Sequence, residues 1–309
     1  MQYRRLGRAG IKVSAVSLGS WITYGGTVDA ARATTCVRAA LDAGINHFDT
    51  ADVYQGGAAE EVLRQALDGV PRHSLVIATK VFWPTGDGPN DRGTSRKHMF
   101  ESLDRSLRRL GTDYVDILYC HRFDSETDPE ETLFALNDLV ASGKVLYAGV
   151  SEWPADRIRE AGGIRRRLGL RALAAAQPNY SLLHRNIERD VMEACRDEGL
   201  GVICFSPLAQ GLLTGKYRSG EAAPAGSRGA GNQRLLRPEA LARVERLREV
   251  CGQAGLPMSR VALAWVLRRP EVTSALIGAS RPEQVEENAA AADLRLPPDL
   301  LEAVEQAVG

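Results

Sequence analysis

The stretch Phe48-Asp49-Thr50-Ala51-Asp52-Val53-Tyr54 decides how the rest of this chain is interpreted. The apolar residues from Ile45 to Phe48 have the composition of the end of a buried strand. That run stops at the carboxylate of Asp49, and the phenol of Tyr54 follows a few residues later. An aspartate after a strand is usually a helix cap or a turn residue. Its meaning here therefore depends on what the neighbouring strands carry.

Two further apolar runs end in a similar way. The run from Leu75 to Thr79 is followed by Lys80, and the run from Val115 to Cys120 is followed by His121. Either residue alone would more often have a structural role. In a parallel barrel, however, the carboxyl ends of all strands share one rim, so these two groups and the two above should converge there.

Strand-like and helix-like segments alternate along the whole chain. Residues 1–15 resemble a β-hairpin with its turn from Gly7 to Gly10, in which Leu6 and Ile11 pack across the turn and the hairpin plugs the bottom of the following structure. Apolar periodicity and helix-capping residues then predict eight strand–helix units, with an extra helix at 259–268 and a terminal helix at 298–308. The strands are expected at 15–18, 47–49, 75–79, 115–120, 147–150, 173–177, 202–205 and 273–277, and the helices at 29–43, 59–67, 95–110, 129–142, 155–168, 186–198, 238–254, 259–268, 281–291 and 298–308.

This order predicts an α/β fold, a (β/α)8 TIM barrel that forms a single domain over residues 1–309. A doubly wound sheet is the alternative, but no GxGxxG motif follows the first strand. The segment from Ser206 to Arg237, after the seventh strand, is the one part expected to lie outside regular structure. Its length and glycine content are typical of a lid, so we expect it to cover a cofactor.

Composition excludes several classes of protein. The chain has 309 residues with 39 basic and 39 acidic side chains, so it lacks the charge excess that binds nucleic acid or acidic lipid. It has no apolar run long enough to cross a membrane, and its N-terminus lacks the apolar core of a signal peptide. The five cysteines are scattered without a CxxC pair, which argues against a zinc site or disulfide framework and favours the cytoplasm.

Several longer motifs resemble one known family, the aldo-keto reductase superfamily, and the resemblance covers the whole chain. Within it the chain is most similar to the potassium-channel β-subunit branch and its bacterial relatives. The motifs that carry the resemblance are Gly44 to Ala51, Gly93 to His98, Arg109 to Asp116, Pro129 to Thr132, Ser206 to Gly211 and Ile277 to Ser280.

The resemblance implies an NADPH-dependent reductase of aldehydes or ketones, with Asp49, Tyr54, Lys80 and His121 as the catalytic tetrad. It also implies where the cofactor binds. The nicotinamide carboxamide would contact Ser151 and Gln177, and Phe205 would stack on the ring. The pyrophosphate loop would include Ser206, Leu208, Gly211 and Lys216, with Arg228 in a more variable part, and the adenosine and 2′-phosphate end would include Ser280, Arg281, Gln284, Glu287 and Asn288.

Elementary chemistry agrees with these roles. Tyr54 would donate the proton, and we expect Lys80 to lower its pKa, with Asp49 holding Lys80 charged. His121 would donate a hydrogen bond to the carbonyl oxygen. Helix amides at Ser280 and Arg281 favour an anion, which indicates NADPH. The aromatic residues Trp21, Tyr24 and Trp83 are candidates for the substrate pocket, although lid packing would explain them equally well.

The sequence leaves alternatives open. The Lys80–Asp49 pair is compatible with a purely structural ion pair, and Lys80 is also compatible with a Schiff-base lyase. The resemblance allows a cofactor-binding regulatory subunit with slow turnover, but His121 counts against it because the mammalian channel subunits have Asn at the matching position. Many family members have Asn where Glu152 stands, so Glu152 is not assigned to the site. The branch includes tetramers, so a homo-oligomer is also compatible with the sequence.

Overall fold

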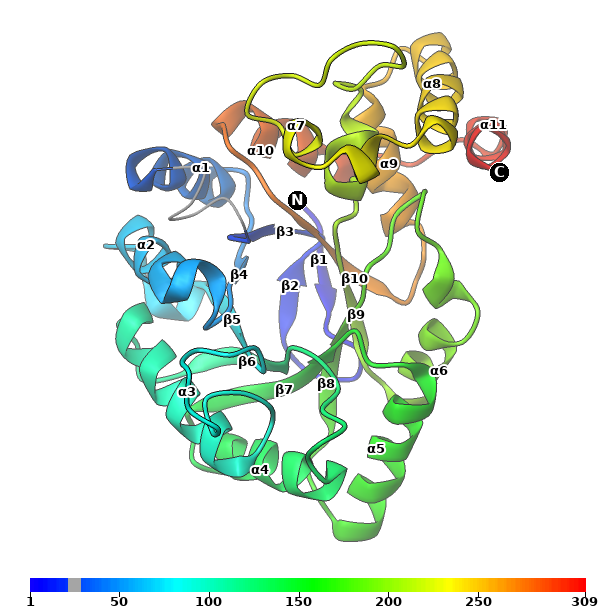
Figure 1. The fold of residues 1–309 in the computed structure, drawn as a ribbon. Coiled ribbons are helices and arrows are strands. Elements are labelled where there is room, and N and C mark those ends of the chain that lie inside the picture. The colour runs from blue at the N-terminus through cyan, green and yellow to red at the C-terminus, as the bar shows by residue number, and fades with distance from the viewer. Residues whose placement is uncertain (22–28) are drawn as a thin grey trace.

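The computed structural model describes residues 1–21 and 29–309 and contains a closed barrel of eight parallel strands. Figure 1 shows the strands as a ring with helices around it. Neighbours follow the chain in order, from β3 to β10, and β10 pairs with β3 to close the ring. The predicted TIM barrel is thus confirmed, and the doubly wound sheet is excluded because that sheet would be open.

The bounds of the elements agree with the expected alternation. The strands of the barrel are β3 (Val16–Gly19), β4 (His47–Asp49), β5 (Val76–Val81), β6 (Val115–Cys120), β7 (Val145–Ser151), β8 (Leu173–Gln177), β9 (Gly201–Phe205) and β10 (Val272–Ile277). The helices around it are α1 (Ala30–Asp42), α2 (Ala58–Ala66), α3 (Arg96–Leu110), α4 (Pro129–Ala141), α5 (Ala155–Leu168), α6 (Val191–Glu198), α7 (Arg228–Gly231), α8 (Pro238–Gln253), α9 (Met258–Leu267), α10 (Pro282–Ala289) and α11 (Pro298–Val308).

The predicted N-terminal hairpin is present and closes one end of the barrel. Strands β1 (Tyr3–Arg5) and β2 (Lys12–Ser14) pair antiparallel. Leu6 and Val13 are fully buried among inward-facing strand residues. A Cβ on Gly7 would lie 2.2 Å from the carbonyl oxygen of Gly199, which ends α6 just before β9, so this close approach requires glycine. The hairpin therefore covers the amino ends of the strands, and their carboxyl ends remain free to form a site.

Two expectations about regular structure were wrong in detail. The predicted helix over 186–198 is divided into a 3₁₀ turn, Asn186–Glu188, and helix α6. The segment from Ser206 to Arg237 is not devoid of regular structure, because it contains the 3₁₀ turns Ala209–Thr214 and Gln233–Leu236 and the short helix α7. Apolar side chains in this segment explain the difference, since Leu212 and Leu213 pack into the core.

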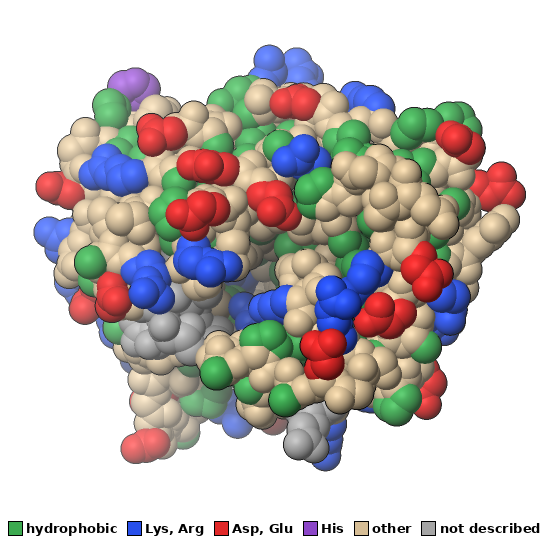
Figure 2. All heavy atoms as spheres, turned by 90° about the horizontal axis from the view of Figure 1, so that it is seen from above, with side chains coloured by type: hydrophobic (Ala, Val, Ile, Leu, Met, Phe, Trp, Pro, Cys, Tyr) green, Lys and Arg blue, Asp and Glu red, His purple; other side chains and the backbone are tan. Residues whose placement is uncertain are grey.

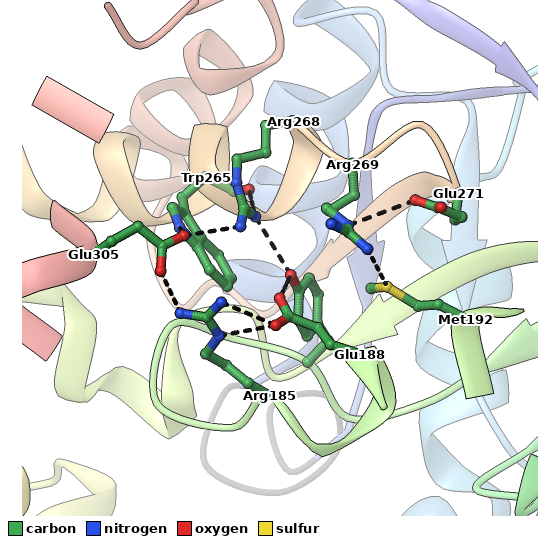
Figure 3. A network of polar contacts seen from close by, with 9 residues as sticks. Arg185, Glu188, Met192, Trp265, Arg268, Arg269, Glu271 and Glu305 are labelled. Atoms are coloured by element: carbon green, nitrogen blue, oxygen red, sulfur yellow. Dashed lines mark hydrogen bonds and ion pairs between the residues drawn. The ribbon is translucent and has the colours of Figure 1, made fainter. Parts of the chain in front are cut away.

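A polar network joins the C-terminal helix to the side of the barrel (Figure 3). The indole of Trp265 on α9 is fully buried and donates a hydrogen bond of 2.8 Å to Glu305 on α11. The guanidinium of Arg268 lies 3.8 Å from the Trp265 ring centroid and bonds Glu305 at 2.9 Å. Arg185 bonds both Glu188 and Glu305. These contacts fix α11 against α9 through charge-assisted hydrogen bonds and cation–π stacking.

The surface carries charges of both signs, as the balanced composition predicts. Figure 2 shows Lys and Arg side chains interspersed with Asp and Glu, and Lys and Arg at the edge of a hollow near the centre of that face. Among residues 1–21 and 29–309, no single helix is long and apolar enough to cross a membrane; by length and composition alone, α8 and α9 would pass that test as a pair, bent by 97°.

Candidate active site

Asp49 and Lys80 form a buried ion pair at the carboxyl ends of adjacent strands. Parallel pairing of β4 with β5 sets Asp49 against Ala78, so the Lys80 side chain lies one inward-facing position further along. The carboxylate is 2% exposed and the lysine 1%. The Lys80 Nζ donates to Asp49 and, at 2.8 Å, to the Thr50 carbonyl oxygen. Burial alone would lower the pKa of Lys80, but Asp49 and Tyr54 outweigh it and raise that pKa, so the lysine stays charged.

Tyr54 lies beside this pair. Tyr54 begins a 3₁₀ turn, Tyr54–Gly57. In this turn Gln55 has a φ of 50°, a left-handed conformation that is uncommon for a residue other than glycine. The Lys80 Nζ lies 3.4 Å from the Tyr54 hydroxyl. Burial raises the pKa of Tyr54 above its ordinary value, and the opposing effect of Lys80 does not cancel it. Lys80 thus lowers the Tyr54 pKa as expected, but desolvation outweighs this effect and the net shift is upward.

His121 follows β6 directly and faces Tyr54. Its backbone N–H bonds the Val81 carbonyl oxygen at 3.0 Å, and its ring lies edge-on to Tyr54 with the centroids 5.7 Å apart. Burial, with help from the charges of Lys80 and Arg122, lowers the pKa of His121 to about 2. The imidazole is therefore neutral at physiological pH and can act as a hydrogen-bond donor rather than as an acid. The four residues converge as the sequence predicted.

Gln177 connects this cluster to the opposite side of the barrel. Its Nε2 donates a 2.8 Å hydrogen bond to the second carboxylate oxygen of Asp49. The Ser151 hydroxyl donates to the Gln177 carbonyl oxygen at 3.0 Å, which holds the ends of β7 and β8 together. This bond between Gln177 and Asp49 was not foreseen, because the two residues are distant in sequence and only barrel closure brings them together.

A cavity of about 810 Å³ opens above these residues and fits a large ligand. It is lined by Asp49, Tyr54 and His121, whereas Lys80 lies behind Tyr54. The residues predicted to bind cofactor all lie on this one cavity: Ser151, Gln177, Phe205, Ser206, Leu208, Gly211, Lys216, Arg228, Ser280, Arg281, Gln284, Glu287 and Asn288. The structure therefore brings these predicted cofactor residues together although they are up to 137 positions apart in the sequence, from Ser151 to Asn288.

The segment after β9 has an unusual backbone conformation. Ser206, Ala209 and Gln210 have φ values between 48° and 55°, and Gly211 has a φ of 99°. Non-glycine residues in this region are strained and occur preferentially at ligand sites. Successive residues that change from negative to positive φ, as Leu208 and Ala209 do, can direct their amide groups to one side and form an anion-binding concavity.

Besides Arg122 beside His121, three cations on the cavity wall have no carboxylate partner within residues 1–21 and 29–309. These are Lys216, Arg228 and Arg281. Arg228 is half-buried, and burial lowers its pKa. Its guanidinium lies 5.4 Å from the Trp21 ring centroid and would lie 3.7 Å from a Cβ on Gly278. Cations placed without partners along one wall favour a ligand with several negative charges.

The far end of the cavity is formed by the start of α10. Ser280 donates to the Gln284 side-chain oxygen through both its backbone N–H, at 2.9 Å, and its hydroxyl, at 3.2 Å. Ser259 donates to Glu287, so the N-terminus of α9 also contributes to this end, which the sequence did not indicate. Arg281 is exposed at the N-cap of α10, where the helix amides favour an anion.

The aromatic candidates for the substrate pocket differ in how they are placed. Trp83 and Trp21 both line the cavity, and Trp83 lies 6.4 Å from the His121 ring. Tyr24 lies outside the described residues. Arg122 also lines the cavity and was missed, although its place directly after His121 at a strand end was a usable signal.

The structure gives Glu152, which stands where many family members have Asn, a role outside the site. It has a φ of 56°, and its carboxylate accepts a 2.7 Å hydrogen bond from the Asn179 backbone N–H. Within the described part of the chain it is not among the residues that line the cavity. The acid therefore braces the neighbouring loop, and leaving it out of the site agrees with its position.

Comparison with known proteins places this architecture in a family. Residues 15–308 match the model of the aldo/keto reductase family. A probable voltage-gated potassium channel subunit beta of Arabidopsis thaliana is 41% identical, with 100% of this chain and 97% of that protein covered. The L-glyceraldehyde 3-phosphate reductase of Escherichia coli K12 is 40% identical, with 93% and 86% covered, and a putative channel subunit beta of Schizosaccharomyces pombe is 40% identical, with 98% and 92% covered. The chain belongs to the aldo/keto reductase family and is an oxidoreductase of that family.

Proposed function

We propose that this protein reduces aldehydes or ketones to alcohols with NADPH, and that Tyr54 donates the proton to the carbonyl oxygen. The observation that carries the proposal is the arrangement at the cavity floor. A buried lysine lies 3.4 Å from a phenol, a neutral imidazole faces that phenol, and the phenol and the imidazole line one large cavity. The reductase among the relatives supports the same chemistry.

The chain's own groups fit a dinucleotide with a 2′-phosphate. The strained segment after β9 offers backbone amides for a pyrophosphate. Lys216, Arg228 and Arg281 offer three cations without carboxylate partners among the described residues, which suits a ligand of high negative charge. Ser151 and Gln177 would hold the carboxamide, and Phe205 would pack on the nicotinamide ring. When bound, NADPH supplies the hydride that the carbonyl carbon accepts.

The protein's part in the reaction is proton supply and orientation. Burial raises the pKa of Tyr54, so the phenol carries its proton at neutral pH. As negative charge develops on the carbonyl oxygen, that proton can move from the Tyr54 hydroxyl to the oxygen, and the charged Lys80 stabilises the phenolate that remains. Asp49 keeps Lys80 charged and in place, and the neutral His121 donates a hydrogen bond that positions the carbonyl.

The relatives named as channel subunits raise a second candidate, a regulatory subunit that retains the cofactor. The presence of a complete Asp49–Tyr54–Lys80–His121 group favours turnover over cofactor retention alone. A Schiff-base lyase is less compatible with the structure, because such chemistry needs a neutral amine and Asp49 holds Lys80 protonated.

The proposal is tested by following NADPH absorbance with a panel of aldehydes, ketosugars and 2-oxo aldehydes and by identifying the alcohol products. We expect substrate-dependent NADPH oxidation with one alcohol formed per NADPH consumed. Borohydride trapping with the same substrates should leave Lys80 unmodified. Tight NADPH binding without turnover of any carbonyl would support the regulatory alternative instead.

A further inference from the structure

Arg122 is a cation at the reacting end of the cavity with few other contacts. Its Nη1 donates a 2.5 Å hydrogen bond to the His121 carbonyl oxygen, and its guanidinium lies 5.5 Å from the Trp83 ring centroid. A guanidinium has five N–H donors, so most of them remain available. It lines the same cavity as Tyr54 and His121, at the end away from the cations predicted to bind cofactor phosphates.

The charge of Arg122 is not neutralised by an acid. Within residues 1–21 and 29–309 it forms no ion pair with a carboxylate, and the sequence of residues 22–28 contains neither Asp nor Glu. The nearby Asp124 is directed elsewhere, to the backbone N–H of Thr94 at 2.7 Å and to the Thr127 hydroxyl at 2.8 Å. Asp49, the acid on the cavity floor, is already paired with Lys80.

The guanidinium is close enough to act on the reacting groups. Burial lowers the pKa of His121 most, and the positive charges of Lys80 and then Arg122 lower it further. Because Arg122 bonds the His121 carbonyl oxygen and lines the cavity together with Tyr54 and His121, an oxyanion bound by Arg122 would lie in the same cavity as a carbonyl held between Tyr54 and His121. The Trp83 ring, 6.4 Å from the His121 ring, provides an aromatic surface beside the guanidinium.

We propose that Arg122 is a specificity-determining residue that selects short carbonyl substrates bearing an oxyanion, either phosphate or carboxylate. The proposal rests on the proposed carbonyl reduction. The planar guanidinium can bind either oxyanion through two parallel hydrogen bonds while Tyr54 and His121 engage the carbonyl. The name of the Escherichia coli relative, a reductase of a phosphorylated aldehyde, is compatible with this selection.

The experiment compares matched substrates that differ in charge. Steady-state rates with saturating NADPH are measured for glyceraldehyde 3-phosphate against glyceraldehyde, and for succinic semialdehyde against butanal. The variants are Arg122→Gln, Arg122→Lys and Arg122→Glu, with Arg243→Gln on the exposed face of α8 as the matched control. The first pair tests phosphate and the second tests carboxylate.

We expect Arg122→Gln to raise KM for the preferred anionic substrate by roughly ten- to a hundredfold and to leave kcat and the neutral substrates within about twofold. Arg122→Lys should recover part of the loss, Arg122→Glu should deepen it, and the wild-type preference should shrink as salt rises. A wild type that reduces neutral and anionic members of both pairs equally would overturn the proposal. Equal losses for charged and neutral substrates in Arg122→Gln would also overturn it, because Arg122 would then only support His121 and Trp83.

A binding measurement separates this proposal from the proposed function. If no carbonyl compound is reduced, carbonyl reduction itself fails, and calorimetric titration with glycerol 3-phosphate and with glycerol still reports on Arg122. Saturable binding of the phosphate compound that Arg122→Gln abolishes would support the anion subsite. A parallel titration with succinate tests the carboxylate. Failure of the wild type to bind both glycerol 3-phosphate and succinate would overturn the proposed anion subsite.

Discussion

Replacement of Lys80 by methionine should destabilise the protein far more than loss of an ordinary lysine. Lys80 and Asp49 are 1% and 2% exposed. Among residues 1–21 and 29–309, Lys80→Met leaves the buried Asp49 carboxylate with only the 2.8 Å side-chain bond from Gln177. Loss of one partner of a buried ion pair costs about 3–5 kcal/mol. Removing both charges leaves no unpaired buried charge. The loss in unfolding free energy of the double variant Lys80→Met, Asp49→Asn should therefore be smaller than the sum of the losses of the two single variants, by about 2–3 kcal/mol.

The assay is equilibrium unfolding in urea of the wild type, both single variants and the double variant. The exposed pair of Lys144 and Asp104, joined at 2.7 Å with side chains 40% and 41% exposed, is the matched control. Lys144→Met should cost less than about 1 kcal/mol because water already screens that pair. The reasoning is refuted if Lys80→Met costs no more than Lys144→Met, or if the effects of Lys80→Met and Asp49→Asn are additive.

Three further predictions concern other parts of the molecule. Arg281→Ala should weaken NADPH binding about tenfold at low salt and leave NADH binding nearly unchanged, because only NADPH carries the 2′-phosphate. Fluorescence titration of both cofactors, with Arg243→Ala as the control, measures this difference. Equal weakening of NADPH and NADH binding would contradict the prediction. The segment from Ser206 to Arg237 should become protected from hydrogen exchange when NADPH binds; unchanged exchange would reject its role as a cofactor lid. Burial raises the pKa of Glu305, but hydrogen bonds from Arg185 and Trp265 outweigh burial and lower that pKa in the folded protein. The stability that the ionised Glu305 provides is therefore present above the unfolded-state pKa and is lost as pH falls through the folded-state pKa. Glu305→Gln should therefore lower stability by about 1 kcal/mol at pH 7 and change it little below about pH 4, as measured by thermal unfolding. An equal loss of stability at both pH values would refute the charge argument.

The fold could be predicted because short apolar strands alternate with helices along the whole chain. Tyr54, Lys80 and His121 could also be located, since strand ends on one rim must converge. The segment after β9 was predicted less well, because its glycines obscured the apolar residues Leu212 and Leu213 that pack into the core.

Other features depend on distances that local sequence does not encode. The Gln177–Asp49 bond and the contact of Ser259 with Glu287 arise only when the ring closes and α9 packs beside α10. The net upward shift of the Tyr54 pKa could not be predicted, because the sequence shows that a cation is near but does not show how completely the phenol is buried.

The most direct test of the account is a comparison of wild type and Tyr54→Phe in the reduction of a good aldehyde substrate by saturating NADPH, with NADPH affinity measured in parallel. The phenylalanine keeps the ring that packs against His121 and removes only the hydroxyl that lies 3.4 Å from Lys80. We predict a loss of about 10²–10⁴-fold in kcat with NADPH affinity unchanged. A Tyr54→Phe variant that reduces the aldehyde within about threefold of the wild-type rate would contradict the central claim that Tyr54 supplies the proton.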